Sequence, residues 1–152
     1  MISLSSGTNP DVFTPCTSPK TNGPLAEGAY TFKVKATDSA GNIGQAASYS
    51  FKVDITRPTI TGLAPAPGSS TSNRRPTIAA TVTYTQTNLN TSDITFFLDG
   101  DKQGKFSYDR NSDRLTFKPN SNLTFGAHTV EVRDEDTAGN QASRSWSFKV
   151  VR

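Results

Sequence analysis

The sequence predicts an all-β protein made of two-layer sandwich modules, and three features support this. Apolar residues make up only 33% of the 152 residues, while Ser, Thr, Gly, Pro and Asn are abundant. Short segments alternate apolar and polar side chains with a period of two, which is the pattern of a half-buried strand. A long stretch of sequence also occurs twice. A thin sandwich with many turns has these properties, whereas a helical protein with a thick core does not.

The repeated stretch links the beginning of the chain to its end. The matched segments are 25–34 with 123–132, 38–42 with 136–140, and 48–53 with 145–150. The first two pairs are 98 residues apart, and the third pair is one residue closer. The sequence Asp-x-Ala-Gly-Asn lies in the middle of both copies. The chain therefore holds two copies of one module, and each copy ends in the same hairpin.

Both hairpins place apolar side chains at every second position. In the last strand, for example, Trp146, Phe148 and Val150 alternate with polar residues. Successive strand residues point to opposite faces, so one face of each hairpin is expected to be buried. The predicted core residues are Phe32, Val34, Phe51 and Val53 in the first copy and Ile78, Val130, Val132, Trp146 and Phe148 in the second.

The segment Asp-x-Ala-Gly-Asn predicts a tight turn between the two strands of each hairpin. Asp can accept a hydrogen bond from an amide two residues on, Gly adopts positive φ without strain, and Asn tolerates the left-handed region. The turn residues are Asp38, Gly41 and Asn42 in the first copy and Asp136, Gly139 and Asn140 in the second. Calcium binding is the competing interpretation, because Asp and Asn carry oxygen ligands. Two side-chain ligands per turn are too few, so no cofactor is expected.

The rest of the second copy divides into further short strands. They are expected at residues 59–63, 76–85, 94–98, 105–108 and 114–117. Turn residues such as Asp99 and Gly100 separate them. With the final hairpin this makes about seven strands in about 95 residues, a number and spacing that indicate an immunoglobulin-like β-sandwich.

In these features the chain resembles the bacterial Ig-like repeats found in tandem in secreted and cell-surface proteins. The resemblance rests on Phe-Thr-Pro-Cys-Thr-Ser-Pro at 13–19, the Leu-x-x-Gly-x-Tyr/His-Thr segments, both turns, and Val-Asp-Ile-Thr-Arg-Pro-Thr at 53–59. It implies architecture more than function, because such modules serve as spacers, stalks, adhesin segments and accessory domains of enzymes. In the family a cysteine before a Ser-Leu pair commonly matches Cys16. Here Ile2 takes that place, so the disulfide is not expected.

The spacing of the repeat predicts one complete module preceded by a partial one. Residues 1–54 form the partial, N-terminally truncated module, 55–58 a linker, and 59–152 the complete module. Carried back from the hairpin, the start of the chain falls near the turn at 99–100. The first module is therefore expected to lack its first two strands and most of the third, and to keep four. Its open apolar face needs a protein partner, a preceding chain segment or a second copy to complete it.

The sequence contains no catalytic constellation, so the chain is predicted not to be an enzyme and to have no catalytic, cofactor-binding or metal-binding residues. Its single histidine, His128, takes the place of Tyr30 in the first copy. This is the tyrosine-corner position, where a polar ring bonds back to loop backbone. Cys16 lies in the other copy, so it forms no nucleophile–base pair with His128. The acidic residues at 99–101 and 134–136 are expected to be solvated loop charges.

Charge and hydropathy exclude two classes of partner and leave several functions open. The 16 basic and 13 acidic residues are scattered, which disfavours nucleic acid, and the apolar runs are too short for a transmembrane helix. The leading hypothesis is a structural, spacer or adhesion segment of a secreted or surface protein, located outside the cell. The alternatives are a virion accessory protein on a capsid or tail, and a carbohydrate- or surface-binding accessory domain of an extracellular enzyme.

Overall fold

The computed structural model describes residues 2–6, 12–85 and 89–152. The chain divides into two compact units, Met1–Thr56 and Arg57–Arg152. The boundary falls inside the segment 55–58 that the sequence suggests as a linker. The described residues contain strands and one short 3-10 turn, η1 (Thr91–Asp93), and none of their helices is long and apolar enough to cross a membrane.

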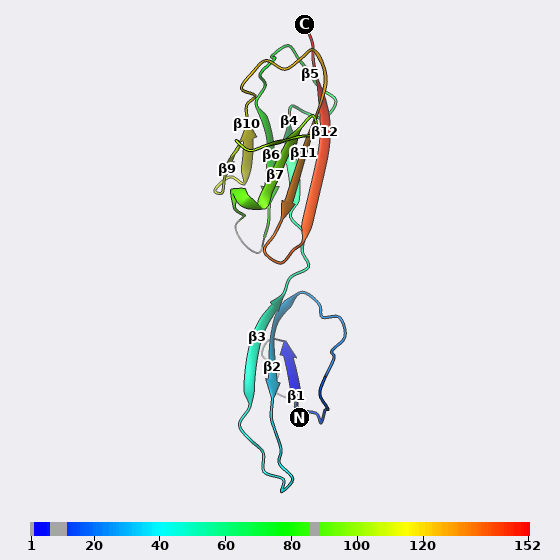
Figure 1. The fold of residues 1–152 in the computed structure, drawn as a ribbon, viewed down its shortest axis with the longest axis vertical. Helices are drawn as coiled ribbons and strands as arrows, with labels where there is room; N and C mark the ends of the chain where they lie inside the picture. The colour runs from blue at the N-terminus through cyan, green and yellow to red at the C-terminus, as the bar shows by residue number, and fades with distance from the viewer. Residues whose placement is uncertain (1, 7–11, 86–88) are drawn as a thin grey trace. The chain divides into compact units, whose positions relative to one another are not determined.

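The second unit is a sandwich of two sheets packed face to face (Figure 1). Its strands are β4 (Thr59–Ala64), β5 (Ser70–Thr71), β6 (Ile78–Thr83), β7 (Ile94–Leu98), β8 (Asp101–Gln103), β9 (Ser107–Asp109), β10 (Arg114–Phe117), β11 (Gly126–Glu135) and β12 (Gln141–Val150). One sheet has the order β4-β6-β10-β9 and the other β5-β12-β11-β7-β8. All neighbours are antiparallel except β5 and β12, which run parallel. This is the immunoglobulin-like sandwich that the sequence predicts.

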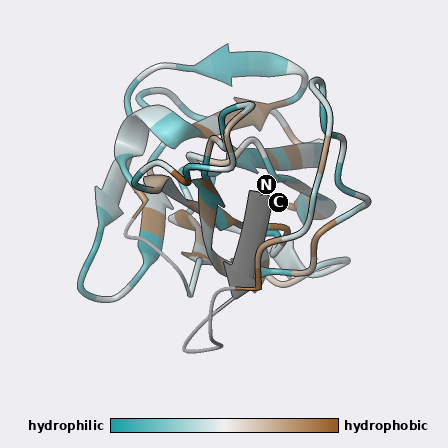
Figure 2. Ribbon diagram, turned by 90° about the horizontal axis from the view of Figure 1, so that it is seen from below, coloured by the Kyte–Doolittle hydropathy of each residue, from teal (hydrophilic) through white to brown (hydrophobic). Residues whose placement is uncertain are grey.

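The core of the second unit lies between its two sheets. The predicted core residues Ile78, Val130, Val132, Trp146 and Phe148 are all 5% exposed or less. Buried residues recur at alternate positions in β7, β10, β11 and the second half of β12. Hydrophobic residues appear as brown bands along strands in Figure 2. The buried indole N–H of Trp146 has a hydrogen-bond partner, because Nε1–H donates to the carbonyl of Pro65 at 3.0 Å.

The first unit contains one sheet in its described residues. Strands β1 (Ile2–Ser6), β2 (Gly28–Val34) and β3 (Ala47–Val53) pair antiparallel in that order (Figure 1). The hairpin is less completely paired than β11 and β12, since only the bridge between Thr37 and Ile43 continues it beyond Val34. The expectation of four strands is therefore corrected to three within the described residues.

The third strand of the module is present in the first unit, contrary to expectation. Leu4 of β1 pairs with Phe32, just as Leu98 of β7 pairs with Val130, the repeat counterpart of Phe32. The strand β1 is thus the counterpart of β7. The offset between Leu4 and Leu98 is 94 residues, not 98, because the segment that follows this strand is shorter in the first copy. If the spacing of 98 residues is carried back to the start of the chain, that start is therefore placed too far along the module.

The predicted core of the first unit is only partly buried. Phe32, Phe51 and Val53 are half-buried, and Val34 is 39% exposed, so its assignment to the core is wrong. The physical reason is the single sheet. In the second unit the side chains at these positions are covered by the sheet β4-β6-β10-β9, and the described residues of the first unit provide no such sheet.

The contrast between Trp146 and its repeat counterpart Tyr49 gives a direct test of this description. Trp146→Ala removes a large buried side chain and should destabilise the second unit by about 3–5 kcal/mol. Tyr49→Ala is the matched control, because Tyr49 is 69% exposed, and it should cost less than about 1 kcal/mol. Calorimetry of the full chain measures both. A loss for Trp146→Ala no larger than that of the control would contradict the core assignment.

Candidate functional site

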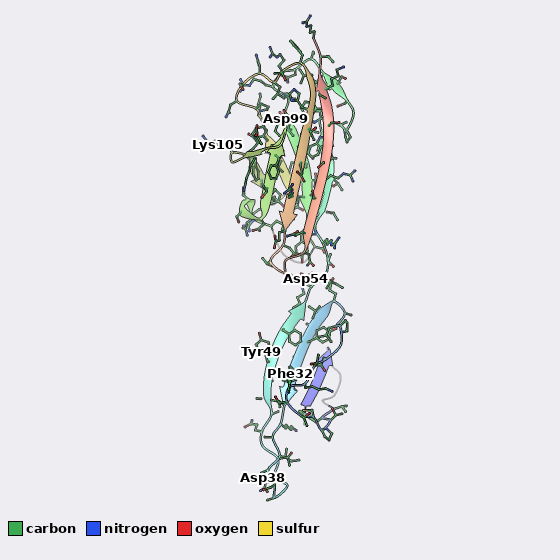
Figure 3. The ribbon with its side chains drawn as sticks, turned by 45° about the vertical axis from the view of Figure 1, so that its right-hand side comes forward. Phe32, Asp38, Tyr49, Asp54, Asp99 and Lys105 are labelled. Atoms are coloured by element: carbon green, nitrogen blue, oxygen red, sulfur yellow. The ribbon has the colours of Figure 1, made fainter. Side chains whose placement is uncertain are left out.

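The two Asp-x-Ala-Gly-Asn turns have the same hydrogen-bond geometry. Asp38 Oδ1 accepts from the amides of Ala40 at 2.9 Å and Asn42 at 2.8 Å, and its Oδ2 accepts from Asn42 Nδ2 at 2.8 Å. Asp136 makes the equivalent three bonds in the second turn at 2.8–2.9 Å. The turn in the first unit is seen at the tip of the hairpin, where Asp38 is labelled (Figure 3). The repeated sequence therefore builds the same local structure twice.

In both turns the carboxylate oxygens accept hydrogen bonds from residues of the same turn. Gly41 and Gly139 have φ of +89° and +88°, the left-handed region in which glycine is unstrained. The side-chain and backbone bonds from Asn42 hold the pKa of Asp38 below its ordinary value. Both oxygens of each Asp already accept hydrogen bonds, and the described residues contain no group of three or more His, Cys, Asp or Glu arranged to hold a metal.

The tyrosine-corner positions hold a ring that bonds back four residues in both units. In the first unit Tyr30 Oη donates to the carbonyl of Ala26 at 2.9 Å. In the second unit His128 Nε2 lies 2.9 Å from the carbonyl of Thr124. A carbonyl can only accept, so Nε2 carries the proton. The two residues anchor equivalent strands to the loop that precedes them.

His128 has a second partner that the sequence did not indicate. Its Nδ1 lies 2.7 Å from Asp99 Oδ2, and Asp99 Oδ1 accepts from the amide of Thr129 at 2.8 Å. The Asp99 side chain is 43% exposed, as expected of a turn residue, but it also pairs with His128 and with the amide of Thr129. Burial of the ring disfavours its charge, but the bonds to the Thr124 carbonyl and the Asp99 carboxylate outweigh this effect. The pKa of His128 consequently lies above its ordinary value.

Asp134 departs from the expectation of a solvated charge. It is 3% exposed, and among the described residues no donor makes a well-formed hydrogen bond to either carboxylate oxygen. It is one of the residues that line an open depression between η1, β7, β11 and β12. Burial raises its pKa to about 6, the charges of Asp93 and Asp136 add to this, and the amide of Glu135 offsets only part. An ionised Asp134 is an unfavourable feature of the folded unit.

One side of the β2–β3 hairpin in the first unit carries apolar side chains that are exposed or only half-buried. We call it the open face, and it comprises Tyr30, Phe32, Val34, Tyr49, Phe51 and Val53. These residues lie on one side of the β2–β3 hairpin by strand alternation. The rings of Tyr30, Phe51 and Tyr49 stack at centroid distances of 5.7 and 6.3 Å. The opposite side carries polar residues, and there Thr31 and Ser50 share a hydrogen bond of 3.0 Å.

The chain belongs to the bacterial Ig-like domain family, whose model matches residues 55–151. No curated protein matches the chain. Among solved structures it is similar to the fibronectin(III)-like modules of CbhA from Clostridium thermocellum, with 23% identity over 98% of this chain and 76% of that chain, and a TM-score of 0.47.

Two further solved structures are more distant. Murine CEACAM1b shares 14% identity over 82% of this chain and 59% of its own, with a TM-score of 0.43. The Bacteroides ovatus protein SGBP-B, solved in complex with a mixed-linkage heptasaccharide, shares 17% identity over 98% of this chain and 37% of its own, with a TM-score of 0.33. The chain thus spans little more than half of one of these proteins and about a third of the other.

The burial of Asp134, unlike its expected solvation, is indicated by the periodicity of its strand. His128, Val130 and Val132 occupy alternate positions, and extending that period by two residues places Asp134 on the same inward face. The pairing of Asp99 with His128 had no such signal, since the two residues are far apart in sequence and meet only because β7 pairs with β11.

Replacing Asp134 by Asn should stabilise the second unit at neutral pH. The pKa of Asp134 is raised from 3.8 to about 6 on folding, so ionisation costs stability as pH rises through this interval. Asp134→Asn should therefore gain about 2–3 kcal/mol at pH 7.5 and nothing at pH 3.5. The fluorescence of Trp146 during urea unfolding measures this. Glu135→Gln, at an exposed neighbour, is the control, and an equal effect in both variants would contradict the assignment.

His128 should make the second unit lose stability in a higher pH range. A raised histidine pKa contributes stability that is complete below the unfolded pKa of 6.5 and is lost as pH rises through the folded pKa. His128→Tyr introduces the ring that the first unit uses at this position and removes the titration. Urea unfolding at a series of pH values above 6 should show a steeper loss of stability for the natural chain than for the variant, whose remaining slope near pH 6 comes from Asp134. Equal slopes would show that His128 is not the titrating group.

Proposed function

We propose that this chain is a non-catalytic structural segment that spaces or presents other parts of a secreted or cell-surface protein. The observation that supports this best is the repeated module, with the same turn geometry and the same corner in both units. Units of this kind joined by a few residues extend a chain stepwise.

A spacer on a surface must resist force along the chain, and the second unit has a feature suited to this. Its strand β5 runs parallel to the final strand β12. Three backbone bonds join this segment to β12 and the residue after it, from Gly68 N to Ser147 O at 2.7 Å, Lys149 N to Ser69 O at 2.8 Å, and Val151 N to Thr71 O at 2.9 Å. Pulling the two ends of the unit loads these parallel bonds together in shear.

Force spectroscopy of the full chain, pulled from both ends, tests the proposal. The second unit should unfold as one discrete event that lengthens the chain by roughly 300 Å. Val151→Pro removes one of the three bonds and should accelerate forced unfolding by roughly five-fold, the equivalent of about 1 kcal/mol. Val151→Ala keeps the amide and is the matched control. If the second unit unfolds without measurable resistance, the proposal that the chain is a spacer that resists force is wrong.

A further inference from the structure

The open face of the first unit is the clearest unexplained surface in the molecule. Tyr49 is 69% exposed and Val34 is 39% exposed, whereas their repeat counterparts Trp146 and Val132 are 5% and 0% exposed. Figure 3 shows Tyr49 on β3 and Phe32 on the neighbouring strand β2. A sheet with one polar and one apolar side normally buries the apolar side.

The second unit shows what covers the equivalent face. The inner side of its β11–β12 hairpin packs against the sheet β4-β6-β10-β9, whose alternate residues Ile78, Ala80 and Val82 are fully buried. Strands β4 and β6 come directly before β7 in the chain, and β7 is the counterpart of β1. Among the described residues of the first unit β4 and β6 have no counterpart, and in the second unit this antiparallel pair supplies Ile60 and Leu63 from β4 and alternate apolar residues from β6 to the core.

Strand pairing at the edge of the hairpin points to the same kind of covering segment. In the second unit β12 has two neighbours, β11 on one side and β5, which lies between β4 and β6 in the chain, on the other. Its counterpart β3 has one neighbour in the described residues, β2. A segment that filled the open face in the manner of β4 and β6 would bring a strand to this edge as well. Backbone pairing would then add to apolar burial.

Tyr49 itself fits this arrangement. Its counterpart Trp146 donates its single N–H to the carbonyl of Pro65, which lies in the segment between β4 and β5. Tyrosine has the same combination of an apolar ring and one polar donor at its tip. A covering segment with a backbone carbonyl at the place of Pro65 would therefore satisfy the Tyr49 hydroxyl while burying its ring.

We propose that the open face binds a polypeptide segment, supplied from outside residues 1–152, that carries two antiparallel strands with apolar side chains on one face, arranged as β4 and β6 are in the second unit. This segment completes the sandwich of the first unit, buries Tyr49 and Phe51, and pairs with the free side of β3. The chemistry that recognises it is apolar complementarity on the face and backbone hydrogen bonding at the edge.

The test supplies such a segment to the full chain. Residues 57–95 of this chain are fused directly before Ile2, so that β1 continues the graft as β7 continues the natural segment. The rate of Tyr49 nitration, mapped by mass spectrometry, should fall by about ten-fold or more relative to the natural chain. The control graft carries Ile78→Asp and Val82→Asp in the added copy alone and should leave the rate unchanged. A second measurement adds residues 57–83 as a separate peptide and follows the backbone amide signals of β2 and β3.

Each outcome decides the proposal. Protection of Tyr49 by the graft, or peptide-induced shifts confined to β2 and β3, supports it. Nitration that is equally fast in all versions, together with amide signals unmoved by the peptide, overturns it. If sedimentation shows that the natural chain dimerises and Tyr49 is protected in the dimer, the occupant is a second copy and the proposal is wrong. Protection of Tyr49 by a soluble glucan, with none from the graft, overturns it in favour of sugar binding.

Discussion

The whole structure depends on burying one face of the hairpin that closes around Asp-x-Ala-Gly-Asn. Apolar burial contributes roughly 25 cal/mol per Å² and is the main force available to a protein so poor in apolar residues. In the second unit the inner face of β11 and β12 is covered, and every predicted core residue is buried. In the first unit the same hairpin keeps its turn and its corner, but Val34 and Tyr49 stay exposed. The difference is that a second sheet, β4-β6-β10-β9, packs against the hairpin in the second unit, while the described residues of the first unit contain no second sheet.

The inner face of β11 carries a titratable residue towards each end. His128 and Asp134 are six positions apart, about 20 Å along a strand. His128 has two acceptors around its ring, so protonation of the ring stabilises the folded unit. Asp134 has no well-formed donor within the described residues, so its charge destabilises the folded unit. Both groups nevertheless make the second unit less stable as pH rises, because folding favours the protonated form in each case.

Local patterns in the sequence were sufficient for most of the fold. The turns and the core of the second unit follow from short segments whose periodicity and residue types act locally. The exposure of Val34 could not be predicted that way, because it depends on a sheet that the pattern of β2 cannot reveal. The position of β1 was obscured by a difference in segment length between the copies. The contact between Asp99 and His128 required the register of β7 against β11.

The sequence of the first unit also indicates whether its open face is suited to be covered or to face solvent. A sheet with both sides in water would carry polar side chains on both. The outer side of this hairpin does carry them, as Thr31 and Ser50 show. The open face instead has aromatic or valine side chains at all its inward positions except Gly28 and Ala47 at the strand ends, and these include the stacked series Tyr30, Phe51 and Tyr49. Such a face left uncovered favours aggregation and gains nothing for the isolated unit. Its residues are those of a buried surface, so the pattern agrees with a covered face and not with a solvent-facing one.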